Sequence, residues 1–350
     1  MSRQKKYLDK DVLTASKERI RHIADTHDTI AVCFSGGKDS LAVLHLVKEV
    51  MDERGVDKVN VIFRDEELIP DQVINFVDKY KQMPWVNMLY FAIPLASTKY
   101  ILGRTYDYIQ WDNSREWVRP KPEYAIVMKE GDDRVFDQYT CDEFIGENFK
   151  GKVAFLTGIR ASESLMRFRA SVNKLYENYI TRTETDKVSL CKPIYDWQEN
   201  DIFRYFYDSK INYCEYYDYQ MMAGGQLRVS TPLHSEMAKR IGLLREVDPA
   251  FYDRVLKLFP EMQVQDRYYK DLDSKALTAK YGKDLASIKT YIDENFTDPN
   301  QSQKAQARYK EVCGLHRRYP ESFPTNYIFK YFVTGAFKRG LLPLGKKKAK

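Results

Sequence analysis

The sequence predicts an α/β fold, a parallel sheet with helices on both faces, followed by an all-helical C-terminal region. Short apolar runs rich in strand formers alternate with stretches whose apolar residues recur at helical spacing. At two places a strand-like run passes through glycine into a helix-like stretch, around Gly36–Gly37 and around Gly158. From about Thr231 helical patterns follow one another, punctuated by prolines.

The first part of the chain contains a β-α-β unit. A helix at residues 11–27 precedes the run Ile30–Phe34, which is too short for a helix and is rich in strand formers. Residues 41–51 have apolar side chains at helical spacing, without glycine or proline, and predict a helix. A short turn around Gly55 leads to a second strand at 58–63. These elements predict a parallel pair with a right-handed crossover.

Further elements follow the β-α-β unit along the chain. The patterns predict a helix at 71–80, strands at 87–93 and 152–157, a helix after Gly158, a helix carrying Ile202 and Phe206, and C-terminal helices at 233–244, 249–259, 285–296 and 301–315. We therefore expect a first domain at residues 1–235, with an aromatic insertion at about 96–150. A helical region at 236–345 and a basic tail at 346–350 are expected to follow.

The insertion has an aromatic and charged centre without periodicity. Residues 105–122 include two tryptophans and several basic side chains. One interpretation is a substrate platform that stacks a base and binds a phosphate. The other, which we favour for most of these aromatic residues, is an insertion that packs its own small core.

The stretch Ser35-Gly36-Gly37-Lys38-Asp39-Ser40 has the features of an anion cradle. Two glycines let backbone N–H groups turn inward, and the start of a helix adds unpaired N–H groups and partial positive charge. Ser35 and Ser40 add hydroxyls, and Lys38 adds a full charge. Phosphate or pyrophosphate is the expected ligand. The adjacent glycines exclude a Walker A loop and a G-x-G-x-x-G loop.

Two other groups of residues are expected at the same edge of the sheet. Arg160 follows Gly158 at the end of a strand, and Glu163 and Arg167 can pair one helical turn apart. A guanidinium suits phosphate or sulfate because it binds these anions bidentately. Asp65 and Glu66 follow the second strand, where they could hold ribose hydroxyls, adenine or Mg²⁺. The alternative for them is a solvated acidic turn that caps the next helix.

Three motifs carry a resemblance to a known family. The stretch Ser35–Ser40 resembles the PP-loop, S-G-G-x-D-S, of the ATP pyrophosphatase superfamily, with the lysine found in phosphoadenosine phosphosulfate (PAPS) reductases and their relatives. Gly158–Arg167 is similar to the G-x-R-x-x-E-S-x-x-R motif of that family, and Lys192–Ile202 is similar to its K-P-I-x-D-W-x-x-x-D-[VI] stretch. The resemblance covers about residues 28–235 and implies an adenine nucleotide α-hydrolase-like (PP-loop) fold.

The resemblance also implies a nucleotide site. It places ATP or PAPS on a set of residues that combines the loop with its neighbours: Ser35, Gly36, Gly37, Lys38, Asp39, Ser40, Asp65, Glu66, Gly158, Arg160, Glu163 and Arg167. The implied catalytic residues are Lys38, Arg160 and Asp39, with Asp39 also the candidate Mg²⁺ ligand. Tyr213–Tyr219 and Arg228 fall where relatives carry another substrate loop.

The expected reaction is ATP cleavage between the α- and β-phosphates, with adenylation of an acceptor and release of pyrophosphate. Resembling enzymes of DNA sulfur modification make nucleic-acid or sulfur modification one expectation. A first alternative is a thiol-dependent, sulfite-forming PAPS reductase that uses Cys313. The segment Glu311–His316 resembles that family's E-C-G-[LI]-H segment, although Val312 is inserted and the segment is far from a mobile tail. A second alternative is a non-catalytic nucleotide-binding regulatory protein.

Composition bears on the ligands, the metal sites and the cellular compartment of the protein. The net charge of +6 is compatible with nucleotide or polyanionic ligands but is no nucleic-acid signature by itself. Five scattered cysteines, without a C-x-x-C pair, argue against zinc and an iron–sulfur cluster and favour a reducing compartment. No stretch reaches the length of a membrane span and no signal core is present, so we expect a cytoplasmic protein. A nucleic-acid or protein partner and a homo-oligomer stay open.

Overall fold

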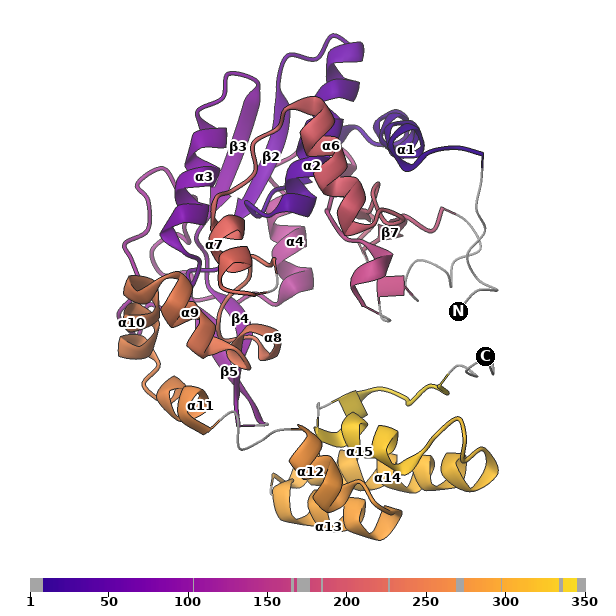
Figure 1. Ribbon diagram of the computed structural model, residues 1–350. Coiled ribbons are helices and arrows are strands. Elements are labelled where there is room, and N and C mark those ends of the chain that lie inside the picture. Colours follow the sequence, from indigo (N-terminus) through magenta and orange to yellow (C-terminus); the bar gives the residue numbers. More distant parts are fainter. Residues whose placement is uncertain are drawn as a thin grey trace. The chain divides into compact units, whose positions relative to one another are not determined.

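Six strands form the central sheet of the protein (Figure 1). The computed structural model describes residues 9–102, 104–164, 167–168, 177–183, 185–225, 227–268, 274–296, 298–333 and 336–344. The strands in spatial order are β3 (Val86–Phe91), β2 (Val59–Arg64), β1 (Thr29–Cys33), β6 (Val153–Leu156), β8 (Val188–Cys191) and β7 (Ile180–Arg182). The neighbours from β3 to β8 pair in parallel, and β7 pairs antiparallel with β8. The expected α/β fold with a parallel sheet is confirmed.

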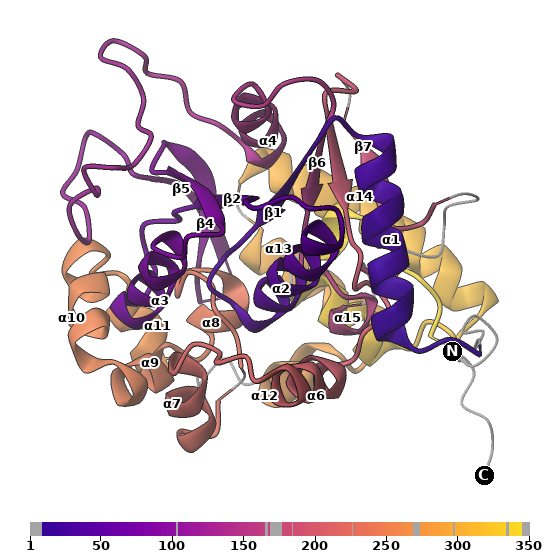
Figure 2. The same ribbon diagram turned by 90° about the horizontal axis from the view of Figure 1, so that it is seen from above.

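Helices cover both faces of this sheet. The described helices of this part of the chain are α1 (Val12–Thr26), α2 (Lys38–Glu53), α3 (Asp71–Lys81), α4 (Gln138–Gly146), α6 (Glu199–Ser209), α7 (Tyr216–Met222), α8 (Ser235–Ala238), α9 (Ile241–Val247) and α10 (Pro249–Leu258), of which α1, α2, α3, α4 and α6 pack against the sheet. Side chains alternate along each strand, so Val61 and Phe63 pack in one core with α1, α2, α3 and α6, whereas Ile62 packs in another with α4. Figure 2 shows α2 and α4 on opposite sides of β1.

The order of the strands places a topological switch point between β1 and β6. The chain runs outward from β1 through β2 to β3, then returns to the other side of β1 as β6. Crossovers therefore leave β1 and β6 in opposite directions, and a crevice opens beyond their carboxyl ends. The loop after β1 is the PP-loop-like stretch, and the loop after β6 begins at Thr157–Gly158. Both predicted motifs consequently meet at this crevice.

The chain divides into two compact units. The sheet unit includes the described residues up to Thr98 and Asp107–Phe259, and the helical unit includes Lys99–Tyr106 and the described residues from Pro260. The sheet unit thus continues past residue 235 and includes α10, which forms an ion pair with α3. Arg254 pairs with Asp71 at 2.8 Å. The domain boundary expected after residue 235 stays a prediction.

The helical unit has its own apolar core. Its helices are α11 (Met262–Tyr268), α12 (Ser274–Tyr281), α13 (Leu285–Asn295), α14 (Pro299–Arg318) and α15 (Thr325–Val333), with the 3₁₀ turn η3 (Ala336–Lys338). Ile288, Ile292, Phe329 and Phe332 are among the buried residues of this core. The expected all-helical C-terminal region is confirmed. The basic tail at 346–350 and most of the helix expected after Gly158 lie outside the described residues.

The expected insertion is more regular than its sequence suggests. It begins with a two-stranded sheet, β4 (Leu95–Ile101) and β5 (Arg104–Gln110), and includes α4. Buried Trp111 packs edge-on against Trp117, with ring centroids 5.7 Å apart. These two tryptophans pack as the interpretation of a small core expects, and for the other aromatic residues that interpretation stays a prediction. Among the described helices, none combines the length and apolar character needed to cross a membrane.

Candidate functional site

A cavity of about 1100 Å³ opens at the switch point of the sheet unit. Its walls come from the loop after β1, the turn after β6, the start of α6 and the segment around α7. The lining residues from the two predicted motifs are Ser35, Gly37, Lys38, Asp39, Ser40, Gly158, Ile159, Arg160, Ser162, Glu163, Ser164 and Arg167. Its volume suits a ligand of nucleotide size. The structure therefore brings the two motifs together, as the sequence predicts.

The loop between β1 and α2 is shaped by its glycines and serines. Gly36 has φ +74°, and a Cβ there would lie 2.7 Å from Cγ1 of Val73, so both conformation and space require glycine. The Ser35 backbone N–H donates to Ser40 Oγ at 3.1 Å, which closes the loop on the first turn of α2. The amino end of α2 consequently faces the cavity with its partial positive charge.

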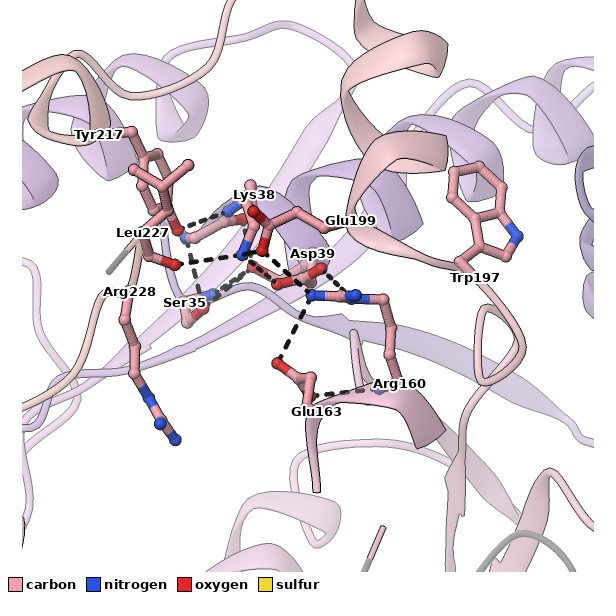
Figure 3. Close-up of polar contacts among 12 residues, drawn as sticks. Ser35, Lys38, Asp39, Arg160, Glu163, Trp197, Glu199, Tyr217, Leu227 and Arg228 are labelled. Atoms are coloured by element: carbon pink, nitrogen blue, oxygen red, sulfur yellow. Dashed lines mark hydrogen bonds and ion pairs between the residues drawn. The ribbon is translucent and has the colours of Figure 1, made fainter. Parts of the chain in front are cut away.

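Lys38 and Arg160 converge on Asp39 (Figure 3). The Nε of Arg160 donates to Asp39 Oδ1 at 2.5 Å, and Nζ of Lys38 donates to Oδ2 at 3.1 Å. Glu199 lies further out, 3.7 Å from Lys38 and 3.9 Å from Arg160. Both cations are only 4% exposed although they line the cavity. Two buried cations from different motifs, held by one carboxylate, form the electrostatic centre of the site.

The turn after β6 must approach α2 closely to place Arg160. A Cβ on Gly158 would lie 2.6 Å from the backbone carbon of Asp39 and from the nitrogen of Ser40. Arg160 then follows before the 3₁₀ turn η1 (Ala161–Glu163). Arg167 pairs with Glu163 as expected. Burial lowers the pKa of Arg167, and the Arg228 guanidinium lowers it further.

The acidic residues after β2 divide into two groups. Asp65 lies outside the cavity lining and is buried, with both carboxylate oxygens bound by Arg119 at 2.7 and 2.9 Å. Glu67 is fully buried and pairs with Arg115. Glu66, between them, lines the cavity. Asp65 therefore anchors the insertion in this structure, and its predicted nucleotide contact stays a prediction that the geometry does not favour.

Asp196 and Lys192 of the third motif, and Cys313, are not among the residues that line the cavity. Asp196 pairs with Arg19 at 2.6 Å, and the N-cap residue of α6 is Gln198. Lys192 is buried, donates to Thr181 at 3.2 Å and does not line the cavity. Cys313 lies in the interior of α14 in the helical unit, and α14 continues through Gly314 to Arg318. These positions make Asp196 and Lys192 structural, whereas the role of Cys313 stays a prediction.

The predicted Mg²⁺ ligand is engaged by cations. Asp39 has one oxygen on Arg160 and the other on Lys38. Within the described ranges no group of three or more histidine, cysteine or acidic residues is arranged to hold a metal ion. The residues therefore do not fit a magnesium ion bound by protein ligands alone.

Four residues around the cavity were not singled out by any pattern in the sequence. Tyr217 of α7 accepts the Lys38 backbone N–H at its hydroxyl, and the Leu227 carbonyl accepts from Lys38 Nζ at 3.2 Å. His234 lines the cavity and contacts Ser97 at 3.0 Å; burial lowers its pKa, as does Arg228. Glu199 is the fourth of these residues and also lines the cavity. The tyrosine-rich run at 213–219 was the available hint for Tyr217, but no pattern singles out one tyrosine of the run.

Comparisons with known proteins found several that are similar to this chain. The E. coli K12 protein YbdN, described as uncharacterized, is 30% identical over 270 residues, which cover 71% of this chain and 65% of YbdN. The chain thus spans just under two thirds of the length of that relative. Similar solved structures include a Candida glabrata FMN adenylyltransferase in complex with ATP, with TM-score 0.40, 15% identity and coverage of 59% of this chain and 57% of that one.

Two further structures are similar at comparable levels. A Candida auris PAPS reductase has TM-score 0.34 and 15% identity, covering 62% of this chain and 88% of that one. A Methanococcus maripaludis U34-tRNA thiolase has TM-score 0.35 and 13% identity, covering 75% and 80%. These structures carry no conclusion about the activity of this chain.

A family model supplies the assignment. The model of the phosphoadenosine phosphosulfate reductase domain matches residues 29–255, which include both motifs and the whole central sheet. The chain belongs to the phosphoadenosine phosphosulfate reductase domain family.

Proposed function

We propose that the protein is an enzyme that binds ATP in this cavity and transfers its adenylyl group to an acceptor, with release of pyrophosphate. The observation that carries the proposal is the convergence of Lys38 and Arg160 on the cavity beside the amino end of α2. Backbone N–H groups and two cations supply the charge that a polyphosphate needs. The family alone leaves ATP and PAPS as alternative nucleotides.

The two cations act on the leaving group in this proposal. The acceptor attacks the α-phosphorus, the bond from that phosphorus to the bridging oxygen breaks, and the electron pair leaves with pyrophosphate. Lys38 and Arg160 stabilise the charge that develops on that leaving group. Their contacts with Asp39 hold both side chains in place before the nucleotide arrives. We propose that Mg²⁺ enters bound to the phosphates, and no step depends on its position.

Pyrophosphate and AMP formation tests the proposal. ATP labelled at the α-phosphate is incubated with the full-length protein and with double-stranded DNA, transfer RNA or small sulfur compounds as acceptors. We expect pyrophosphate release together with an adenylated acceptor or AMP, and loss of both products in Arg160→Ala. Absence of pyrophosphate with every acceptor, in protein that binds ATP, would contradict adenylation and favour a regulatory role.

The same experiment with PAPS as the substrate in place of ATP tests the reductase alternative. Sulfite release from PAPS that disappears in Cys313→Ser, with nucleotide binding retained, would replace adenylation by the thiol-dependent reductase reaction. We expect no sulfite, and we expect Cys313→Ser to leave ATP turnover unchanged. Gly314→Ala, next to it in α14, is the matched control for disturbance of the helix.

A further inference from the structure

Tyr217 contacts the amino end of α2 from outside the loop. Its hydroxyl accepts the backbone N–H of Lys38, the first residue of α2, at 2.9 Å. A Cβ on Gly37 would lie 3.1 Å from the same hydroxyl oxygen, so the tyrosine fits against the loop because residue 37 is glycine. Tyr217 also lines the cavity, and Figure 3 shows its hydroxyl directed toward Lys38.

The ring that carries this hydroxyl is fixed. Tyr217 is 2% exposed and belongs to the core that contains α1, α2 and α6. Tyr213 packs edge-on against it, with ring centroids 6.3 Å apart. A side chain packed in this way does not swing aside when a ligand enters, so a phosphate at the amino end of α2 meets the hydroxyl in place.

The hydroxyl has an unused donor. A phenol both accepts and donates, and here the oxygen accepts from Lys38. Among the described residues, the hydroxyl makes one hydrogen bond, with the Lys38 N–H, and none in which its own O–H is the donor. Burial raises the pKa of Tyr217 well above its usual value, so the proton stays on the oxygen. A buried donor at a cavity wall calls for an acceptor from the ligand.

We propose that Tyr217 is a phosphate-binding residue that relays the anion-binding capacity of α2 to the nucleotide. The hydroxyl takes the N–H of Lys38 and donates its own O–H to a phosphate oxygen. This inference rests on the proposed function, because it requires a phosphate in the cavity. It extends the cradle from the loop to α7, a helix far along the chain.

A tyrosine that blocks phosphate binding and a tyrosine that assists it predict opposite changes in affinity when the hydroxyl is removed. If the tyrosine only blocked the Lys38 N–H, removal of its hydroxyl would free that donor and strengthen phosphate binding. If the tyrosine relays, removal of the hydroxyl loses a hydrogen bond to a charged ligand and weakens binding by about tenfold. The direction of the change therefore separates the two roles.

Titration calorimetry with inorganic pyrophosphate and with ATP tests the relay. The full-length wild type is compared with Tyr217→Phe and with Tyr213→Phe. Tyr213→Phe removes a hydroxyl that donates to Asp218 at 2.9 Å, so it is a matched control from the same segment. We expect about tenfold weaker binding of both ligands by Tyr217→Phe and unchanged binding by Tyr213→Phe. Thermal unfolding without ligand shows whether each variant is folded.

A second measurement detects the hydroxyl's hydrogen bond by absorption spectroscopy. A new hydrogen bond from a tyrosine hydroxyl shifts its absorption band, so pyrophosphate is expected to produce a tyrosine difference spectrum in wild type and in Tyr213→Phe. Its absence overturns the relay, as does unchanged or tighter binding by Tyr217→Phe, or an equal loss in both variants. If wild type binds ATP normally in such a case, the proposed function stands. If wild type binds neither ligand, both proposals fall.

Discussion

Gly158→Ala tests whether the two motifs must touch to form the site. The methyl group would lie 2.6 Å from the backbone carbon of Asp39 and 2.6 Å from the nitrogen of Ser40. Real Cβ atoms do not approach backbone this closely, and neither partner is a flexible side chain. The turn after β6 and the first turn of α2 must therefore move apart, carrying Arg160 away from Lys38.

The cost can be estimated from the same contacts. Overpacking of a closely packed contact costs about 1–3 kcal/mol. For a unit of this size each kcal/mol lowers the unfolding temperature by about 2–4 °C. The effect on ligand binding is expected to be larger than the effect on folding, because displacement of the turn breaks the 2.5 Å contact between Arg160 and Asp39. We expect at least tenfold weaker ATP binding.

Calorimetric titration of ATP and thermal unfolding measure both effects. Gly314→Ala is the control, because no atom lies within 4 Å of the added methyl group and the residue is inside α14. It is expected to stabilise the protein by about 0.5–1 kcal/mol without any effect on ATP. If Gly158→Ala bound ATP as tightly as wild type at an unchanged unfolding temperature, the close approach of the two motifs would be refuted as the basis of the site.

Two further predictions concern residues that do not line the cavity, His45 and Asp65. Burial lowers the pKa of His45 to about 4, whereas the histidine of the unfolded chain has the ordinary pKa of 6.5. The folded protein therefore binds this proton only at a lower pH than the unfolded chain does. The stability from this group is full above 6.5 and is lost as pH falls toward 4; His45→Gln should lose that part of the pH dependence, and parallel unfolding profiles would contradict it. Asp65→Asn leaves Arg119 buried without its charged partner, so we expect a loss of about 3–5 kcal/mol in denaturant unfolding with unchanged ATP affinity in folded protein. Unchanged stability with lost ATP binding would instead make Asp65 a nucleotide ligand.

Local signals explain which elements were predictable. β1, β2 and β3 are apolar runs between turns, and α2 and α3 have clear helical periodicity, so their bounds agree with expectation within a few residues. The strand–loop–helix geometry at residues 29–53 was predictable for the same reason, because one short stretch holds the strand, the glycines and the helix start.

Tertiary contacts explain what was missed. β7 has three residues and β8 has four; β8 is held as a strand by its pairing with β6, and β7 by its pairing with β8. Asp65 was expected in the site by its position at a strand end, but Arg119 from the insertion reaches it from 54 residues away. Tyr217 reaches Lys38 over 179 residues. No local pattern encodes such pairs, since each member alone is an ordinary surface or core residue.

Calorimetric binding of ATP, PAPS and adenosine 3′,5′-bisphosphate to the full-length protein tests the central claim most directly. The claim is that the cavity at the switch point is an adenine nucleotide site built on Lys38 and Arg160. We predict that ATP binds with one site per chain and that Lys38→Ala weakens this binding by about tenfold or more, whereas Lys192→Ala, which alters a buried lysine outside the cavity, does not. Failure of all three nucleotides to bind the folded wild-type protein would contradict the claim.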